Sequence, residues 1–577
     1  MSRTTRRVLI GFAVLVVLTG WRGFRSLQVY RHLSAARDVL GAVPTTLAPD
    51  TGARLGAQAR AASADVRAAK SAADDPVFWL AAHIPVAGRC FALARGAAIV
   101  SEQVVDQVLT PAAMVANSLQ RERLVHGGRI NVTLLEQLDA PLRRAAVGSA
   151  EARRTADALP SRLVPAALLA QRRVLVDQVD RLERAISAAS TAVHLAPDML
   201  GRSGVRRYFV AVQNNAETRG TGGLIGAYAV VRADRGRLTR ERVGTEADLQ
   251  PAPGPVVDLG KEYADHYDQY RSRQDWRSAV ITPEWPSAAA TIAGLWTHQS
   301  GQVVDGVLGL DPRAMADVLS VTGPVQAGGR SISGANVVDF VLKDEYSLFA
   351  TRPALRKPVL GLLAGGIFDK VVSGAGSSSG LLKAFASAAS SGHLFLWSRH
   401  AEEQAALRRG AIGGRLPDAP SSLEVSSVNA AGSKLDYYVR RTVGYVRTGK
   451  NRAVASVTLL NTVNAKAVPD FVKSRIDRYG FNPTITGLDG STSQILTIYG
   501  GNQRGVYGAT VNGAPAVFEY GVESGHPYAT TTVELKPGIP VRVEVTLSDF
   551  GGTLVYRQQP LVTDDTLRIP VSHVVRG

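Results

Sequence analysis

The sequence has very little sulfur. Cys90 is the only cysteine among 577 residues, and there are four methionines. One thiol excludes an intramolecular disulfide and any metal site built from several cysteines. Aromatic residues are also few, at 6%, whereas hydrophobic residues as a whole reach 45%. The folded parts must therefore be stabilised by the packing of mainly aliphatic cores.

Acidic residues are too few to balance the basic ones. The chain has 66 Lys and Arg against 49 Asp and Glu, a formal net charge of +17. This charge favours polyanionic partners, although a GC-rich coding sequence explains the abundance of Arg equally well. No zinc-ligand spacing and no aromatic-basic ribonucleoprotein motif occurs, so nucleic acid is not an expected partner. Anionic lipid and acidic cell-wall polymer remain as the expected polyanionic partners.

Long apolar runs are absent except near the N-terminus. Residues 8–21 (VLIGFAVLVVLTGW) are uncharged and follow three arginines, Arg3, Arg6 and Arg7. The stretch is short for a membrane span, but a snorkelling Arg22 lets the helix continue to residue 27. No small-residue cleavage site follows it, which favours a signal anchor over a cleaved signal peptide. We expect a cytoplasmic tail at 1–7, an anchor at 8–27 and the rest outside the cytoplasm.

Beyond the anchor we expect three regions, because 577 residues exceed the roughly 250 to 300 at which one core stops growing. Residues 28–203 show apolar positions at helical spacing, which predicts a helical stalk or bundle. Strand-length apolar runs alternate with helical stretches over 204–415, which predicts an α/β domain. Short alternating runs over 416–577 predict a β-sandwich. The fold class is α+β multidomain.

Local signals place several helix ends. Pro286 is expected to open a helix that Gly301 ends. Asp311, directly before Pro312, is expected to cap the next helix. Residues 373–380 (SGAGSSSG) are expected to form a loop.

The strongest functional signal is residues 214–223 (NNAETRGTGG), predicted as a loop between two central strands. Such loops hold ligands in α/β sheets. A guanidinium binds anions bidentately, and glycines let backbone N–H groups approach them. The alternative is an ion pair that only rigidifies a turn. The candidate ligand-binding residues of this loop are Asn214, Asn215, Glu217, Arg219, Gly222 and Gly223.

The run YFVAVQNNAETRGTGGLIGAY, residues 208–228, resembles the signature of the domain of unknown function 4012 family of bacterial envelope proteins. Further similar stretches follow the chain in order: PVFWLAAHIPVAGR, GQVVDGVLGLD, TGPV, ANVVDF, GHLFLWSRHAEEQ and NAAGSKLDYYV. The resemblance implies an envelope protein whose biochemical role is not established.

The central region also resembles, more distantly, the LytR-CpsA-Psr phosphotransferases, which attach lipid-linked glycopolymers to the cell wall. An acidic residue and an arginine follow their first strand, as Glu217 and Arg219 do here. Arg352 and Arg356 stand where that family places pyrophosphate-binding arginines, so both join the candidate ligand-binding residues. However, Gly222 and Gly223 replace the family's Arg-Asp pair, and no counterpart of its Pro-Arg-Asp motif occurs near residues 245–248.

Three hypotheses follow. The first is an envelope protein that binds an anionic glycolipid or cell-wall polymer. The second is a divergent phosphotransferase acting on polyprenyl-pyrophosphate-linked glycan, the only case in which a divalent metal is expected. The third is a structural scaffold with envelope protein partners. No cofactor is otherwise evident, and catalytic residues are not assigned.

Overall fold

The chain forms two compact units. A computed structural model describes residues 63–85, 88–449, 451–479, 488–502, 505–549, 551–569 and 574–576. The described part of the helical unit comprises residues 63–85, 88–126, 130–199 and 378–383. The larger unit comprises residues 127–129, 200–377 and the described residues from 384 onward.

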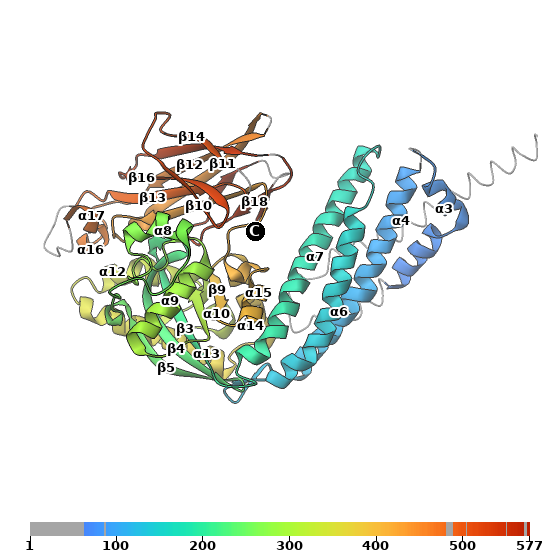
Figure 1. Ribbon diagram of the computed structural model, residues 1–577. Coiled ribbons are helices and arrows are strands. Elements are labelled where there is room, and N and C mark those ends of the chain that lie inside the picture. Colours follow the sequence, from blue (N-terminus) through green and yellow to red (C-terminus); the bar gives the residue numbers. More distant parts are fainter. Residues whose placement is uncertain are drawn as a thin grey trace, which may run out of the picture. The chain divides into compact units, whose positions relative to one another are not determined.

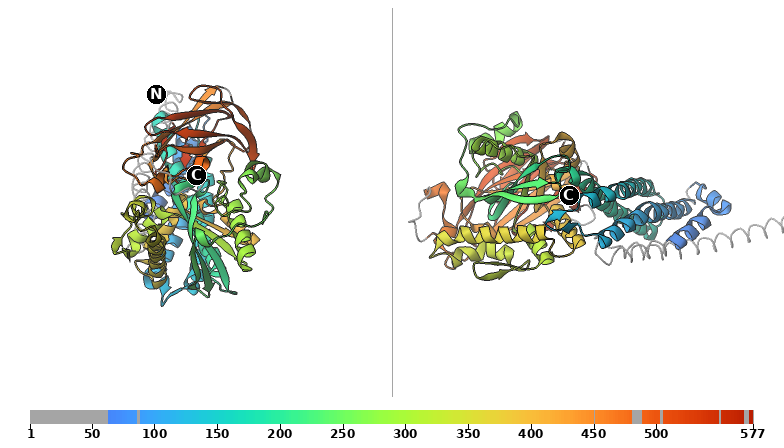
Figure 2. Two further views of the ribbon diagram at one scale, coloured as in Figure 1. Left: turned by 90° about the vertical axis from the view of Figure 1, so that its left-hand side faces the viewer. Right: turned by 90° about the horizontal axis from the view of Figure 1, so that it is seen from below.

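The helical unit is built from long helices, as predicted. Residues 63–73 are helical, and α6 and α7 run side by side (Figures 1 and 2). Asn131 caps α6 by accepting a hydrogen bond from the Leu134 backbone N–H at 2.9 Å. The remaining elements are α3 (Pro76–Ala82), α4 (Arg89–Glu102), the π-helix η1 (Gln103–Leu109), α5 (Thr110–Arg121), β1 (Val125–His126), β2 (Arg129–Ile130), α6 (Val132–Asp157) and α7 (Ala166–Met199).

The helices of this unit pack through small aliphatic side chains. A shared core joins α4, η1, α6 and α7 through Val100, Val104, Ala152 and Val179. The predicted anchor at residues 8–27 lies outside the described residues. Within the part that is described, no helix is long and apolar enough to span a bilayer.

The larger unit contains a mixed sheet whose central strands are ordered β5-β4-β3-β6-β9. Only β3 and β6 pair in parallel, with Tyr208 opposite Gly306. The two predicted strands on either side of 214–223 are present as β3 and β4, and β5, which was not predicted, follows them directly. Tight turns at residues 220–221 and 235–236 make these three strands antiparallel. The strands are β3 (Arg206–Arg219), β4 (Gly222–Asp234), β5 (Arg237–Thr245), β6 (Gly306–Leu310) and β9 (Leu394–Ser398).

A helix rich in Trp and Ala covers this sheet. The helix α9 (Trp285–Ser300) buries Trp285, Ile292 and Trp296 against Phe209 of β3. Pro286 opens it and Gly301 ends it in the left-handed conformation, as predicted. The other elements of residues 246–415 are η2 (Glu246–Asp248), α8 (Lys261–Tyr267), η3 (Asp268–Tyr270), α10 (Pro312–Thr322), β7 (Val325–Ala327), β8 (Arg330–Ile332), α11 (Val337–Asp339), η4 (Phe340–Asp344), α12 (Glu345–Leu348), η5 (Pro353–Leu355), α13 (Arg356–Ser373), α14 (Ser378–Ser390), α15 (Ala401–Leu407) and η6 (Ala411–Gly413).

Two local predictions have different outcomes. Asp311 caps α10 as predicted, since its Oδ1 accepts the backbone N–H groups of Arg313 and Ala314 at 2.9 and 3.2 Å. The predicted loop at residues 373–380 is partly wrong, because α14 already begins at Ser378. Serine and glycine at a helix start are common, and the composition of the segment concealed that start.

Two sheets of the C-terminal region pack face to face around one core, as predicted (Figure 1). Val541, Val543, Val545 and Leu547 of one strand all point into it. One sheet is ordered β15 (Glu519–Glu523), β16 (His526–Leu535), β13 (Thr492–Tyr499), β10 (Ser422–Asn429), β18 (Leu554–Arg557) and β20 (Val574–Arg576). The other is ordered β14 (Val506–Val511), β17 (Val541–Ser548), β12 (Arg452–Asn461), β11 (Val439–Gly449) and β19 (Thr566–Arg568). Three short helical elements complete the region: η7 (Leu435–Tyr438), α16 (Asp470–Lys473) and α17 (Ile476–Tyr479).

Candidate functional site

The segment 214–223 is the tip of a long hairpin rather than the predicted loop. β3 continues to Arg219 and β4 starts at Gly222. The pairing register shifts between Asn214 and Thr218, so residues 215–217 bulge out of the ladder. Polar composition suggested a loop, but strand pairing with β4 and packing against the sandwich hold the segment extended.

Arg219 lies inside the protein with every nitrogen of its guanidinium hydrogen-bonded. Its Nη2 donates to Glu217 Oε1 at 2.8 Å, and its Nε donates to the Arg277 carbonyl at 3.0 Å. Its Nη1 donates to the carbonyl oxygens of Thr218 and Asn429 at 2.9 and 3.2 Å. Burial lowers the pKa of Arg219 to about 10, which leaves it charged at neutral pH.

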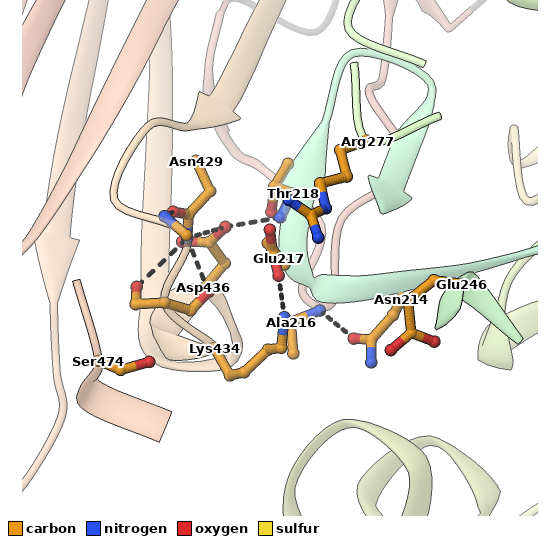
Figure 3. Close-up of polar contacts among 12 residues, drawn as sticks. Asn214, Ala216, Glu217, Thr218, Glu246, Arg277, Asn429, Lys434, Asp436 and Ser474 are labelled. Carbon is orange, nitrogen blue, oxygen red and sulfur yellow. Dashed lines mark hydrogen bonds and ion pairs between the residues drawn. The ribbon is translucent and has the colours of Figure 1, made fainter. Parts of the chain in front are cut away.

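The hairpin tip is joined to the sandwich by charge and hydrogen bonds. Lys434 forms an ion pair with Glu217, as Figure 3 shows. The Asp436 carboxylate accepts hydrogen bonds from the Thr218 backbone N–H at 2.7 Å and from Asn429 Nδ2 at 2.9 Å. Since Lys434, Asp436 and Asn429 all belong to the C-terminal region, the tip is a structural junction between sheet and sandwich.

A glutamine of the sandwich closes the same junction. Gln559 Nε2 donates to the carbonyl oxygens of Arg219 and Ser427 at 2.9 and 2.8 Å. Gln559 Oε1 in turn accepts from the Ser427 N–H at 2.8 Å. These bonds satisfy backbone groups at the hairpin turn that would otherwise be buried without partners.

The neighbouring side chains of Asn214 and Asn215 point in different directions. Asn214 Nδ2 donates to the Tyr346 hydroxyl at 2.9 Å. Asn215 Nδ2 donates to Asp311 Oδ2 and to the Pro560 carbonyl, each at 3.0 Å. Asp311 Oδ2 also lies 2.6 Å from Nδ1 of the buried His393. The bulge thereby links β3 to α12, to the start of α10 and to β9.

The two glycines are required by close packing. Gly222 has φ +132°, and a Cβ there would lie 2.6 Å from Gln213 Oε1. A Cβ on Gly223 would lie 2.2 Å from the Asn214 carbonyl oxygen. Both positions therefore admit no side chain without a shift of neighbouring atoms.

Arg352 and Arg356 flank η5, and Arg356 is linked to the hairpin through Tyr346, whose hydroxyl accepts from Asn214. Arg352 is exposed directly before η5. The Arg356 guanidinium stands over the rings of Tyr346 and Phe471, 5.2 and 4.9 Å from their centroids. Among the described residues, no hydrogen bond or ring contact joins either arginine to Arg219. The structure brings the six hairpin residues together. Arg356 lies beside them through the shared contact with Tyr346, and Arg352 is exposed to solvent.

A small cavity lies beside the hairpin. It has a volume of about 20 Å³, room for one water molecule. Thr218, Asp436, Arg441 and Gln494 are among its lining residues, and none of the eight candidate residues lines it. Within the described ranges, no group of three His, Cys, Asp or Glu side chains has the arrangement of a metal site.

Sequence reasoning missed the sandwich partners of the hairpin. Lys434 and Asp436 lie in the stretch NAAGSKLDYYV, which the sequence analysis noted only as a resemblance. They are more than 200 residues from Glu217, and nothing in either segment indicates the pairing.

Residues 203–346 match the model of a family described as "Protein of unknown function (DUF4012)". The match runs from just before β3 to Tyr346 and so includes the hairpin tip and Asp311. Membership, expected from the run at residues 208–228, is thereby confirmed for this segment. Comparison with curated proteins gave no match. The resemblance to LytR-CpsA-Psr phosphotransferases, with the activity and metal that it implies, stays a prediction.

Proposed function

We propose that this chain, a DUF4012 protein through residues 203–346, is a membrane-anchored extracytoplasmic protein of the bacterial cell envelope that binds an anionic glycolipid or cell-wall polymer. The observation that carries the proposal is Arg356, a cation that lies over the adjoining rings of Tyr346 and Phe471 and has no ion-pair partner among the described residues. The net charge of +17 supports the same class of ligand.

The surface around Arg356 suits an amphiphile. The contacts with Tyr346 and Phe471 hold the guanidinium in place through cation–π attraction, and leave its N–H groups for a phosphate or carboxylate. Arg352 adds a second exposed cation. Phe471 and Leu355 are 48% and 47% exposed, so apolar surface lies beside the charge. A polyprenyl-pyrophosphate-linked glycan carries both features, a diphosphate and a hydrocarbon chain.

Binding measurements on the full chain test this assignment. The double variant Arg352→Gln, Arg356→Gln is expected to lose affinity for polyprenyl-pyrophosphate lipids and for anionic cell-wall polymer. The control is Arg408→Gln, Arg409→Gln, which removes the same charge from exposed positions after α15. An equal loss in both variants indicates attraction by net charge alone, and unchanged binding in the first rejects the site.

The hairpin residues need their own test, because Asn214, Asn215, Glu217, Arg219, Gly222 and Gly223 stay candidates for ligand contact. The Arg219→Lys variant keeps the charge and loses the fork of hydrogen bonds. If affinity per folded molecule falls, the hairpin contributes to binding. If only stability falls, Arg219 belongs to the framework of the fold.

A structural scaffold is the second candidate function, and the burial of the Glu217–Arg219 pair favours it. A ligand site needs accessible charge, whereas these two side chains are 5% and 9% exposed and fully paired. In this function the joined sheet and sandwich act as a rigid platform for other envelope proteins. Crosslinking in intact cells distinguishes the two, since a scaffold yields defined protein adducts that survive Arg352→Gln, Arg356→Gln.

The membrane anchor is tested separately. The full chain is expected to stay in the membrane fraction after alkaline extraction, and a variant lacking residues 8–27 is expected to be released. An external protease should reach the C-terminal region in spheroplasts. Release of the full chain by alkali rejects the anchor at residues 8–27.

A further inference from the structure

The helix α3 and the residues directly after it present a group of large apolar side chains to solvent. Trp79, Leu80 and Ile84 are 45%, 59% and 41% exposed. Trp79 and Leu80 belong to α3, and Ile84 follows two residues after its end at Ala82. The Trp79 ring lies 4.1 Å from that of His83. Single exposed aliphatic residues are ordinary on proteins, but three large ones within six residues form a patch that calls for a partner.

A backbone hydrogen bond joins this patch to the residue before α4. The Gly88 N–H donates to the Ile84 carbonyl at 2.9 Å. A Cβ on Gly88 would lie 2.5 Å from the carbonyl oxygens of both Ala81 and Ile84. Because only glycine fits there, the orientation of α3 relative to α4 is determined by the backbone.

The connection between α6 and α7 adds a second apolar residue group at the same end of the helical unit (Figure 1). Arg89 Nη1, at the start of α4, donates to the Arg162 carbonyl at 3.4 Å. Leu163, the next residue, is 66% exposed and has φ +56°. A left-handed conformation is costly for leucine, yet it turns this side chain outward while Val164 packs inward against Leu93.

We propose that this end of the helical unit is a membrane-contacting tip. Trp79, Leu80, Ile84 and Leu163 enter the interfacial layer of an anionic bilayer, and the exposed Arg162 lies among the lipid phosphates. Tryptophan and arginine are the residues that favour this layer. This inference rests on the proposed anchor at residues 8–27.

Two observations favour lipid over a protein partner. The tip has four apolar side chains, whereas a stable protein interface takes roughly 20 to 30 residues from each side. The apolar stretch at 8–21 is separated from the helix at 63–73 by the 41 residues 22–62, and a tethered tip meets the bilayer at a high effective concentration. Shallow insertion of a few side chains then suffices for contact.

Depth-dependent quenching in the full chain tests the tip. In a Cys90→Ser background, Leu80→Cys and Leu163→Cys carry a fluorophore, and the chain is reconstituted in nanodiscs of phosphatidylglycerol and phosphatidylcholine. The matched control is Val147→Cys on α6, which is 68% exposed in the same unit. Spin-labelled lipids are expected to quench most of the fluorescence at positions 80 and 163 and none at position 147.

The charge requirement is tested in the same system. Arg162→Gln is expected to reduce quenching at position 163, and Arg144→Gln, an exposed position on α6, is expected to leave it unchanged. Discs of phosphatidylcholine alone should give weaker quenching at both tip positions.

The outcomes separate the tip from the anchor. If the chain stays in the discs but positions 80 and 147 are quenched equally, the proposed membrane contact of the tip is rejected and the anchor is retained. A protected fluorophore at position 80 without lipid quenching indicates a protein partner and also overturns it. If the chain fails to enter the discs, the anchor at residues 8–27 is rejected, and the proposal for the tip, which rests on it, is rejected as well.

Discussion

Glu217 Oε1 and Arg219 Nη2 lie 2.8 Å apart inside the junction between the β3–β4 hairpin and the sandwich. Both side chains are less than one tenth exposed, and Lys434 contacts the other oxygen of the carboxylate. Two cations thus share one anion. Removal of either arginine or lysine leaves buried polar groups without partners, so the junction is sensitive to single substitutions.

The first prediction concerns this pair. Arg219→Met is expected to lower the free energy of unfolding by about 3 kcal/mol, because breaking a buried pair leaves an incompletely compensated charge. Urea unfolding followed by tryptophan fluorescence measures the loss. Arg409→Met, which removes an exposed arginine, is the control. Equal stability of the two variants contradicts a structural role for Arg219.

Gly222 gives a second prediction through its backbone. Its φ of +132° and the nearby Gln213 Oε1 disfavour any side chain. Gly222→Ala is expected to cost roughly 1 to 3 kcal/mol of stability. Gly226 on the same strand is the matched control, since a Cβ there meets its first neighbour only at 3.7 Å. Gly226→Ala should be nearly neutral, and a similar loss at both positions shows that strand propensity, not strain, is responsible.

The third prediction concerns pH. Burial raises the pKa of Glu345 to about 8 from the usual 4.5, and the charge on Arg356 only partly offsets this. Its Oε2 is buried without a hydrogen-bond partner among the described residues. A folded-state pKa above the unfolded value means that the folded protein binds more protons between these values. The contribution to stability is therefore complete below pH 4.5 and is lost as the pH rises through 8.

The measurement is the unfolding midpoint in urea at pH 6 and pH 9 for wild type and Glu345→Gln. The wild type is expected to lose more stability than the variant over this interval, because glutamine carries no ionisable proton. Glu402→Gln, at an exposed position, should behave as wild type. A variant that follows the wild-type pH dependence shows that Glu345 does not titrate in this range.

The fourth prediction concerns Asp311. Asp311→Ala removes the cap of α10 and the partner of His393 and Asn215, and is expected to cost about 2 to 4 kcal/mol. Asp311→Asn keeps a capping oxygen and should lose less. Calorimetric melting compares the two variants. Equal losses in both indicate that the charge of Asp311, rather than its capping, is the larger contribution.

Several helix ends and strands of this chain were predicted correctly from its sequence. The Asp311–Pro312 helix start, the Pro286 and Gly301 ends of α9 and the alternating strand at 541–547 follow from short-range rules of capping, backbone conformation and strand periodicity. Such features depend on neighbouring residues only. The antiparallel pairing of β3, β4 and β5 was not predicted, because the sequence did not reveal the tight turns within residues 214–223 and 233–237 that produce it.

The sequence alone determined the helical, mixed and all-β regions, the basic charge and the DUF4012 character of residues 203–346. Only the tertiary structure decided the environment of the run NNAETRGTGG, because Lys434, Asp436 and Gln559 reach Glu217, Thr218 and Arg219 from more than 200 residues away. A Glu and an Arg close together in sequence can form an anion-binding site where they are exposed, or an ion pair where they are buried. Burial decides between the two, and burial is a property of the folded chain.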